Sequence, residues 1–169
     1  MPICYLDRDG VFNHHLPYVG TLDRFIWHKE IIDILKILKG FNYRFILVTN
    51  QSGIGRGYYS IDEFNSINKV IKEKLSLNDL SIEIRFCPHT PNDKCKCRKP
   101  STGMIDIDLR TNKDIFIGDQ PSDMLCAFKG GVKHRWLINK NNCKKSTRWA
   151  KNHNTLFFEI KNWYLSDIE

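Results

Sequence analysis

The stretch ICYLDRDG, at residues 3–10, joins a short apolar run to an acidic turn. The apolar part, Ile3–Leu6, has the length and composition of a buried β-strand. The same arrangement recurs twice, because YRFILV at residues 43–48 leads into TNQSG and DIFI at residues 114–117 leads into GDQPSD. Polar motifs that follow successive buried strands are typical of a parallel sheet whose ligands bind at the carboxyl ends of its strands.

Helix-like segments alternate with these runs. Apolar residues recur at helical spacing in three segments, which are Glu30–Leu38, Ile61–Leu75 and Pro121–Phe128. Ser60 and Glu63 have the spacing of a capping box ahead of the second segment. Two more strand-like runs are Ile82–Phe86 and Arg135–Ile138. The alternation predicts an α/β protein with a three-layer, Rossmann-like, mainly parallel sheet covered by helices on both faces.

Length, composition and charge set the broad class. The chain has 169 residues, 41% of them hydrophobic and 27% charged, which suits one domain over residues 1–169. It has no run of about 18 apolar residues and no signal-peptide pattern at its start, so we expect a cytoplasmic protein without a membrane span. The net charge of +7 indicates either a solvated, lysine-rich surface or an attraction for anions such as phosphates or nucleic acid.

The acidic turn after the first strand could carry catalysis. A carboxylate such as Asp7, held beside a cation, can attack phosphorus and form an acyl phosphate. A second carboxylate such as Asp9 can protonate the leaving oxygen and then deprotonate water. Mg²⁺ suits such a site because it takes oxygen ligands, including those of substrate phosphates. The alternative is a simple turn in which Arg8 forms a surface ion pair.

Three other polar segments could complete a phosphate site. Thr49, Asn50 and the glycine-rich loop after them could cradle phosphate oxygens, or the glycines could serve only the turn. Arg98 and Lys99 could neutralise a transferring phosphoryl group, or be ordinary surface charge.

Two acids after the third strand could belong to the same site. Asp119 could complete a Mg²⁺ shell with Asp7, and Asp123 could orient the site by hydrogen bonds. Both could instead be an N-cap and a first-turn acid of the following helix.

A cluster of cysteines supplies a separate signal. Cys87, His89, Cys95 and Cys97 lie within eleven positions, and three thiolates with one imidazole make a closed tetrahedral Zn²⁺ site. A closed site leaves no position for water, so its role would be structural. The alternative is a set of reduced cysteines that happen to lie close together.

Taken together, these motifs resemble those of the haloacid dehalogenase-like phosphatases. The resemblance covers residues 3–138 and rests on LDRDGVFN (6–13), VTNQSGIGRGYY (48–59), CPH…CKCRKP (87–100) and IGDQPSDM (117–124). They are similar to one branch, which holds the D-glycero-D-manno-heptose 1,7-bisphosphate phosphatases and the histidinol-phosphate phosphatases. The resemblance implies that the zinc loop covers the active site and that there is no separate cap domain.

The resemblance also implies roles for the acidic residues. Asp7 would be the nucleophile, and Asp9 would be the general acid and base. Asp119, Asp7 and the backbone carbonyl of Asp9 would hold Mg²⁺, with Asp123 in support.

The remaining implied roles concern the phosphoryl group and the substrate. Thr49, Arg98 and Lys99 would stabilise the phosphoryl group. Substrate contacts would come from two loops and the residue after Asp119, namely His15, Leu16, Pro17, Tyr18, Asn50, Gln51, Ser52, Arg56 and Gln120. In the heptose enzymes a lysine is usual where this chain has Gln120.

Several functions remain open from the sequence. The first is a monomeric phosphatase that hydrolyses the C7 phosphate of the heptose bisphosphate and feeds nucleotide-heptose synthesis for lipopolysaccharide or another surface glycan. The second is histidinol-phosphate phosphatase. The third is a nucleic-acid 3′-phosphatase, which the charge favours and the cysteine cluster disfavours. A non-enzymatic alternative is a zinc-stabilised binding protein whose phosphatase site has decayed.

Overall fold

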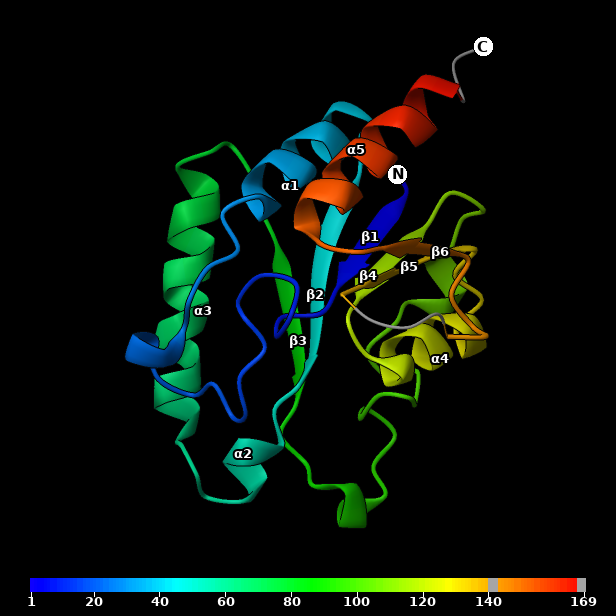
Figure 1. The fold of residues 1–169 in the computed structure, drawn as a ribbon. Coiled ribbons are helices and arrows are strands. Elements are labelled where there is room, and N and C mark those ends of the chain that lie inside the picture. Colours follow the sequence, from blue (N-terminus) through cyan, green and yellow to red (C-terminus); the bar gives the residue numbers. More distant parts are fainter. Residues whose placement is uncertain (140–142, 167–169) are drawn as a thin grey trace.

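A computed structural model describes residues 1–139 and 143–166, so two parts of the predicted domain, 140–142 and 167–169, lie outside the described residues. The described residues form a six-stranded parallel sheet in the order β3-β2-β1-β4-β5-β6 (Figure 1). The strands are β1 Ile3–Leu6, β2 Arg44–Asn50, β3 Glu83–Cys87, β4 Ile115–Gly118, β5 His134–Ile138 and β6 Arg148–Ala150. The predicted mainly parallel sheet is confirmed.

Helices cover both faces of the sheet. They are α1 Ile31–Gly40, α2 Ser52–Gly55, α3 Ile61–Ser76, α4 Pro121–Lys129 and α5 His153–Ser166, with short 3₁₀ turns at Leu22–Arg24, Pro91–Asp93 and Ile107–Leu109. Leu6 faces the core under α1, α3 and α5, whereas Tyr5 faces the core under α4. Successive strand residues point to opposite faces, so a strand covered on both sides is apolar throughout. The predicted three-layer arrangement is therefore confirmed.

The predicted elements agree with the structure to within a few residues. Ser60 accepts a hydrogen bond from the Glu63 backbone and the Glu63 side chain returns one, so the capping box that starts α3 is confirmed. β2 runs two residues further than predicted and includes Thr49 and Asn50. Strand β6 and helices α2 and α5 are not among the elements that the sequence analysis expects. A signal for α5 was present in the helical spacing of Leu156, Ile160 and Trp163, whose side chains are all buried.

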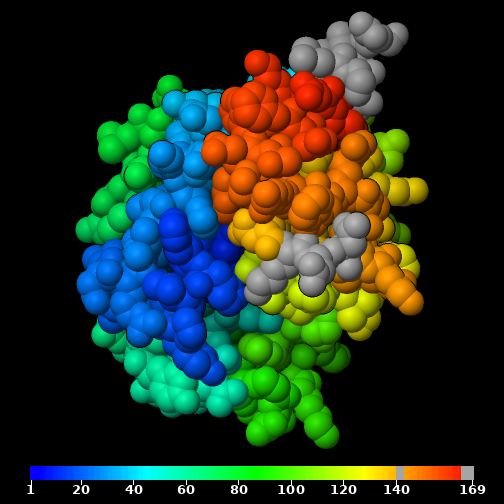
Figure 2. Space-filling model, in the orientation of Figure 1, coloured from blue at the N-terminus to red at the C-terminus, as the bar shows by residue number. Residues whose placement is uncertain are grey.

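The topology brings the motif-bearing loops together. β1 lies at the centre, where Leu6 pairs with both Leu47 of β2 and Ile117 of β4. All three strands run the same way, so the segments after them emerge at one edge of the sheet (Figure 1). On the surface, the blue N-terminal loop borders the turquoise α2 region, and the green segment after β3 lies beside that region (Figure 2).

Candidate active site

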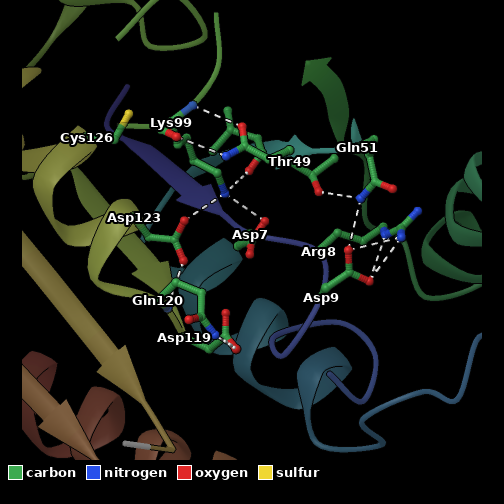
Figure 3. Close-up of polar contacts among 12 residues, drawn as sticks. Asp7, Arg8, Asp9, Thr49, Gln51, Lys99, Asp119, Gln120, Asp123 and Cys126 are labelled. Atoms are coloured by element: carbon green, nitrogen blue, oxygen red, sulfur yellow. Dashed lines mark hydrogen bonds and ion pairs between the residues drawn. The ribbon is translucent and has the colours of Figure 1, made fainter. Parts of the chain in front are cut away.

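The centre of the site is a buried lysine between two buried carboxylates. Lys99 Nζ lies 2.7 Å from Asp7 Oδ1 and 2.8 Å from Asp123 Oδ1 (Figure 3). It also donates a hydrogen bond to the backbone oxygen of Val48, 2.8 Å away. All three donor positions of the ammonium group are thereby used, which is what a buried lysine requires. The site thus has a fixed positive charge beside the carboxylate that ends β1.

The polar contacts of Asn50 fix the backbone of this lysine. Its side-chain amide donates to the Lys99 carbonyl at 3.0 Å and accepts from the Lys99 N–H at 2.9 Å. This pair of bonds ties the end of β2 to the loop that follows the cysteine cluster. Sequence reasoning expects Asn50 at the substrate, whereas its amide is engaged with the backbone of Lys99.

A third carboxylate, Asp119, completes an acidic cluster. Asp7, Asp119 and Asp123 each offer an oxygen within 4.8 Å of the others. Burial and the charge of Asp7 raise the pKa of Asp119 to about 6. Burial likewise raises the pKa of Asp7 to about 7, with Lys99 opposing it and Asp123 adding to it. One lysine does not neutralise three carboxylates in such a place, so the cluster favours an additional cation.

The donor set fits Mg²⁺ in particular. Asp119 Oδ2 accepts from Gln120 Nε2 at 2.7 Å and lies 2.8 Å from His15 Nδ1. Asp119 Oδ1 is buried and has no hydrogen-bond partner among the described residues. A buried carboxylate oxygen without a donor, close to a second carboxylate, is a ligand of the kind that Mg²⁺ takes. Asp7 and Asp119 therefore fit the ion, while Asp123 is engaged with Lys99 and the Gln120 N–H.

Two glycines allow the acidic groups to approach the backbone. At Gly10 (φ +86°), an added Cβ would lie 2.4 Å from Asp119 Cγ, and at Gly118 it would lie 2.5 Å from Asp123 Cβ. Contacts that short do not occur between real atoms, so neither position accepts another residue without moving an acid. The small residues in DRDG and IGDQ therefore make room for the cluster.

Asp9 lies outside this cluster, in a network of its own (Figure 3). Arg8 Nη2 donates to both carboxylate oxygens of Asp9 at 3.0 Å, and Asn13 Nδ2 donates to Asp9 Oδ1 at 2.9 Å. Gln51 Nε2 donates to Oδ2 at 2.9 Å. The guanidinium of Arg8 also donates to the backbone oxygen of Val19. Asp9 is thus held in one orientation by side chains from two segments, the turn after β1 and the end of β2.

The burial of Arg8 corrects one interpretation of the acidic turn. The alternative of a surface ion pair is wrong, because Arg8 is fully buried. Its charge is matched by Asp9, and its guanidinium lies 5.8 Å from the centre of the Phe64 ring on α3. Arginine is almost never fully buried unless it is paired, so sequence patterns alone favour the wrong location.

Thr49 and Gln51 continue the Asp9 network. Gln51 Nε2 donates to Thr49 Oγ1 at 2.7 Å, and Gln51 Oε1 accepts from the Tyr59 hydroxyl at 2.5 Å. Gln51, Thr49 and Tyr59 are all buried. Sequence reasoning missed Tyr59 and Asn13, although the three glycines before Tyr59 in SGIGRGYY were a hint of close packing there.

The cysteine cluster has the shape of a metal site. Cys87 Sγ lies 3.5 Å from both His89 Nδ1 and Cys95 Sγ, and Cys97 Sγ lies 3.3 Å from His89 Nδ1 and 3.4 Å from Cys95 Sγ. Tetrahedral Zn²⁺ with bonds of ~2.3 Å to sulfur would separate its ligands by roughly 3.5 to 3.8 Å. The four side chains therefore fit Zn²⁺ as a closed set.

The other residues expected at the site lie around it rather than in it. Arg98 is half-buried and donates to the backbone oxygen of His89 at 3.2 Å, which ties it to the cysteine loop. Gln120 and His15 reach the cluster through Asp119. The rest make no polar contact with the acidic cluster among residues 1–139 and 143–166; Leu16, Pro17 and Tyr18 lie in the loop after β1, and Ser52 and Arg56 lie at the two ends of α2.

Comparison with known proteins gives concordant matches. The family model described as polynucleotide kinase 3 phosphatase matches residues 15–164. A D-glycero-beta-D-manno-heptose-1,7-bisphosphate 7-phosphatase of Helicobacter pylori is 36% identical over 155 residues, covering 87% of this chain and 88% of the relative. A D-glycero-alpha-D-manno-heptose-1,7-bisphosphate 7-phosphatase of Campylobacter jejuni is 34% identical over 142 residues, covering 80% of this chain and 81% of the relative.

Solved structures agree with the sequence relatives. The crystal structure of D,D-heptose 1,7-bisphosphate phosphatase from B. bronchiseptica, complexed with magnesium and phosphate, superimposes with a TM-score of 0.85 and 27% identity. The match covers 96% of this chain and 99% of that one. The chain therefore belongs to the haloacid dehalogenase-like phosphatases, in the family described by the polynucleotide kinase 3 phosphatase model and alongside the heptose 1,7-bisphosphate 7-phosphatases.

Proposed function

We propose that this protein is a magnesium-dependent phosphatase that removes the C7 phosphate of D-glycero-D-manno-heptose 1,7-bisphosphate through an aspartyl-phosphate intermediate. The observation that carries the proposal is the Lys99–Asp7 contact at 2.7 Å, together with Asp119 Oδ1, which has no hydrogen-bond partner within residues 1–139 and 143–166. The names of the relatives and the magnesium and phosphate in the B. bronchiseptica structure support the substrate and the ion.

The first step belongs to Asp7. One carboxylate oxygen attacks phosphorus, a P–O bond to Asp7 forms, and the bond between phosphorus and the sugar oxygen breaks. Lys99 holds Asp7 in place and neutralises charge that gathers on the phosphoryl oxygens. Bound Mg²⁺, held by Asp7, Asp119 and the Asp9 carbonyl, would supply further positive charge there.

The proton transfers belong to Asp9. Its carboxyl protonates the departing sugar oxygen, and its carboxylate then takes a proton from the water that attacks the phosphoryl group on Asp7. The second attack releases inorganic phosphate and restores Asp7. In the structure Asp9 faces Arg8, Asn13 and Gln51, so its side chain must exchange some of these contacts for the sugar oxygen during the cycle.

The proposal also assigns supporting roles to the loops. The four side chains of the cysteine cluster would hold one structural Zn²⁺, and this closed set would stiffen the segment that carries Arg98 and Lys99. Thr49 and Arg98 bind phosphoryl oxygens, and the exposed residues from His15 to Tyr18 and at Arg56 contact the rest of the substrate. The buried carboxylate of Asp123 pairs with Lys99 and so helps to hold it in place, but Asp123 has no direct role at phosphorus.

The setting of the enzyme is part of the same proposal. Among the described residues, no helix combines the length and apolarity needed to cross a bilayer. We infer a monomeric cytoplasmic enzyme whose product enters nucleotide-heptose synthesis, for lipopolysaccharide or another surface glycan.

One other phosphatase activity has an observation in its favour. The matching family model is described as a polynucleotide 3′-phosphatase, and the net charge is +7. If a nucleic acid were the substrate, turnover would fall steeply as salt rises, because phosphate contacts release counterions. A small sugar phosphate predicts a much shallower dependence on salt.

A panel of substrates tests the proposal. Phosphate release with Mg²⁺ would be measured for both anomers of the heptose bisphosphate, for histidinol phosphate and for a 3′-phosphorylated oligonucleotide, with Asp7→Asn as the control. We expect the highest kcat/KM for one heptose anomer, and no phosphate release by the Asp7→Asn variant. Faster turnover of histidinol phosphate or of the oligonucleotide would overturn the heptose assignment, and equal activity in Asp7→Asn would overturn the mechanism.

A further inference from the structure

The buried side chain of Tyr59 has no part in the mechanism above, yet it contacts the site. Its ring fills the space between two glycines, because an added Cβ would lie 2.0 Å from the ring at Gly20 and 2.1 Å from it at Gly53. The ring is therefore held on both sides by backbone. Burial raises the pKa of Tyr59 to about 12, so the phenol remains a hydrogen-bond donor at neutral pH.

The Tyr59 hydroxyl determines which way the Gln51 amide points. Its O–H donates to Gln51 Oε1 at 2.5 Å. Asp9 accepts from Arg8, Asn13 and Gln51 in the structure, so the amide nitrogen of Gln51 is the end that faces it. With Oε1 on Tyr59, both N–H groups of Gln51 are used, one on Asp9 Oδ2 at 2.9 Å and one on Thr49 Oγ1 at 2.7 Å (Figure 3). A flipped amide would bring two acceptors together at Asp9.

The orientation of Gln51 has a consequence for Thr49. Because Thr49 Oγ1 already accepts from Gln51, its own hydrogen is left to donate elsewhere. Thr49 is the last residue but one of β2, at the same edge of the sheet as Asp7, and in the proposed mechanism it binds a phosphoryl oxygen. The same amide also holds one oxygen of Asp9. The side chain of Gln51 therefore orients both the Thr49 hydroxyl, which would donate a hydrogen bond to the phosphoryl group, and Asp9, the proposed general acid.

We propose that Tyr59 is a positioning residue for phosphoryl transfer, acting through Gln51 to orient Thr49 as a donor and Asp9 as the general acid. This role rests on the proposed phosphatase function. Tyr59 touches neither substrate nor metal in this proposal. Its effect passes through the amide of Gln51 and is lost when that amide is absent.

A double-mutant cycle tests this route. Tyr59→Phe keeps the ring between the glycines and removes only the hydroxyl. We expect kcat to fall about ten-fold with little change in KM, since one neutral hydrogen bond of this kind contributes roughly that factor. In a Gln51→Ala background, the same Tyr59→Phe change should leave kcat unaltered, because the residue through which it acts is gone.

A matched control separates positioning from general stability. Tyr43 is also buried, and its hydroxyl donates to the Lys113 backbone oxygen at 2.7 Å near the start of β2, at the opposite end of the sheet. Tyr43→Phe should lower thermal stability at least as much as Tyr59→Phe while leaving kcat unchanged. A drop in kcat for both variants would show a structural effect and overturn the proposal.

Substrates with different leaving groups separate the effect that passes through Asp9 from the effect that passes through Thr49. The leaving oxygen of an activated aryl phosphate needs little protonation as it departs. The contact of Gln51 with Asp9 should therefore matter less for an aryl phosphate than for a sugar phosphate. We expect Tyr59→Phe to lose more activity on the sugar phosphate. If the losses of kcat from Tyr59→Phe and Gln51→Ala were additive in the double mutant, Tyr59 would not act through Gln51. That result would overturn the positioning role and leave the proposed function standing. A wild-type protein inactive on every phosphomonoester would overturn both.

Discussion

The ammonium group of Lys99 lies 2.7 Å from Oδ1 of Asp7, although 92 positions separate the two residues in the chain. Both side chains are buried. The charges of Asp123 and Asp7 outweigh the effect of burial and hold the pKa of Lys99 above its ordinary value. This ion pair links the acidic turn after β1 to the loop that follows the cysteine cluster.

Removal of Lys99 should cost both stability and activity. Lys99→Met leaves Asp7 and Asp123 buried without their counter-charge, and breaking a buried pair in this way costs about 3–5 kcal/mol. Urea denaturation at pH 7.5 measures the free energy of unfolding. The exposed Lys96, in the same loop, provides the control; Lys96→Met should change the free energy by less than about 0.5 kcal/mol. Equal effects of the two variants would contradict the buried ion pair.

The acidic cluster should make Mg²⁺ binding depend on pH. Burial raises the folded-state pKa of Asp7 to about 7 and of Asp119 to about 6, so the folded state keeps protons that the unfolded chain has lost. Without Mg²⁺, these groups therefore lower stability as pH rises from about 4 to 7. Protons compete with Mg²⁺ for the carboxylates, so the ion should raise Tm more at pH 8 than at pH 5.

The difference in Tm with and without Mg²⁺ is the informative quantity. Burial and the neighbouring His153 lower the pKa of His28 to about 4, which has the opposite sign: its contribution makes stability rise with pH between about 4 and 6.5. That contribution cancels in the difference. Asp119→Asn should abolish the Mg²⁺ effect at both pH values, and an unchanged effect in this variant would place the ion elsewhere.

Loss of one cysteine ligand should release Zn²⁺ and weaken the active site. Cys97→Ser removes a ligand one residue before Arg98, so we expect the zinc content to fall well below one equivalent and kcat to fall with it. Elemental analysis and thermal unfolding measure the two effects. Cys143→Ser is the matched control, since Cys143 is not among the four clustered ligands. Full zinc content in Cys97→Ser would contradict the ligand set.

Two glycines with similar backbone angles should respond differently to alanine. Gly10 has φ +86° and Gly57 has φ +72°, but an added Cβ meets Asp119 only at Gly10, while nothing lies within 4 Å at Gly57. Gly57→Ala should cost about 1 kcal/mol of backbone strain and keep activity. Gly10→Ala should cost more and lose most of its activity, because Asp119 must move. Phosphate release and denaturation together check this pair, and similar behaviour of both variants would refute the close contact.

The sequence predicted the sheet well because its signal is local. Ile3–Leu6 and the runs before TNQSG and GDQPSD are continuous apolar stretches, and strands buried on both faces have that composition. The clustering of Cys87, His89, Cys95 and Cys97 was also predictable, since the four residues lie close in the chain. These features require no knowledge of long-range packing.

The polar networks could not be predicted in the same way. The contact of Asp7 with Lys99, and that of Tyr59 with Gln51, depend on the strand order and on the loops that follow the strands. The burial of Arg8 depends on a partner, Asp9, and on the ring of Phe64 from a separate helix. Side chains of these types are usually exposed, so their composition gives no warning of burial.

The most direct test is chemical trapping of the phosphorylated enzyme during turnover of the heptose bisphosphate. Acid quench, borohydride reduction of the acyl phosphate and peptide mass spectrometry locate the modified residue. We predict homoserine in place of Asp7, and none in a reaction without substrate. Turnover with Asp7 unmodified, or with the modification at Asp9, would contradict the assignment of Asp7 as the nucleophile.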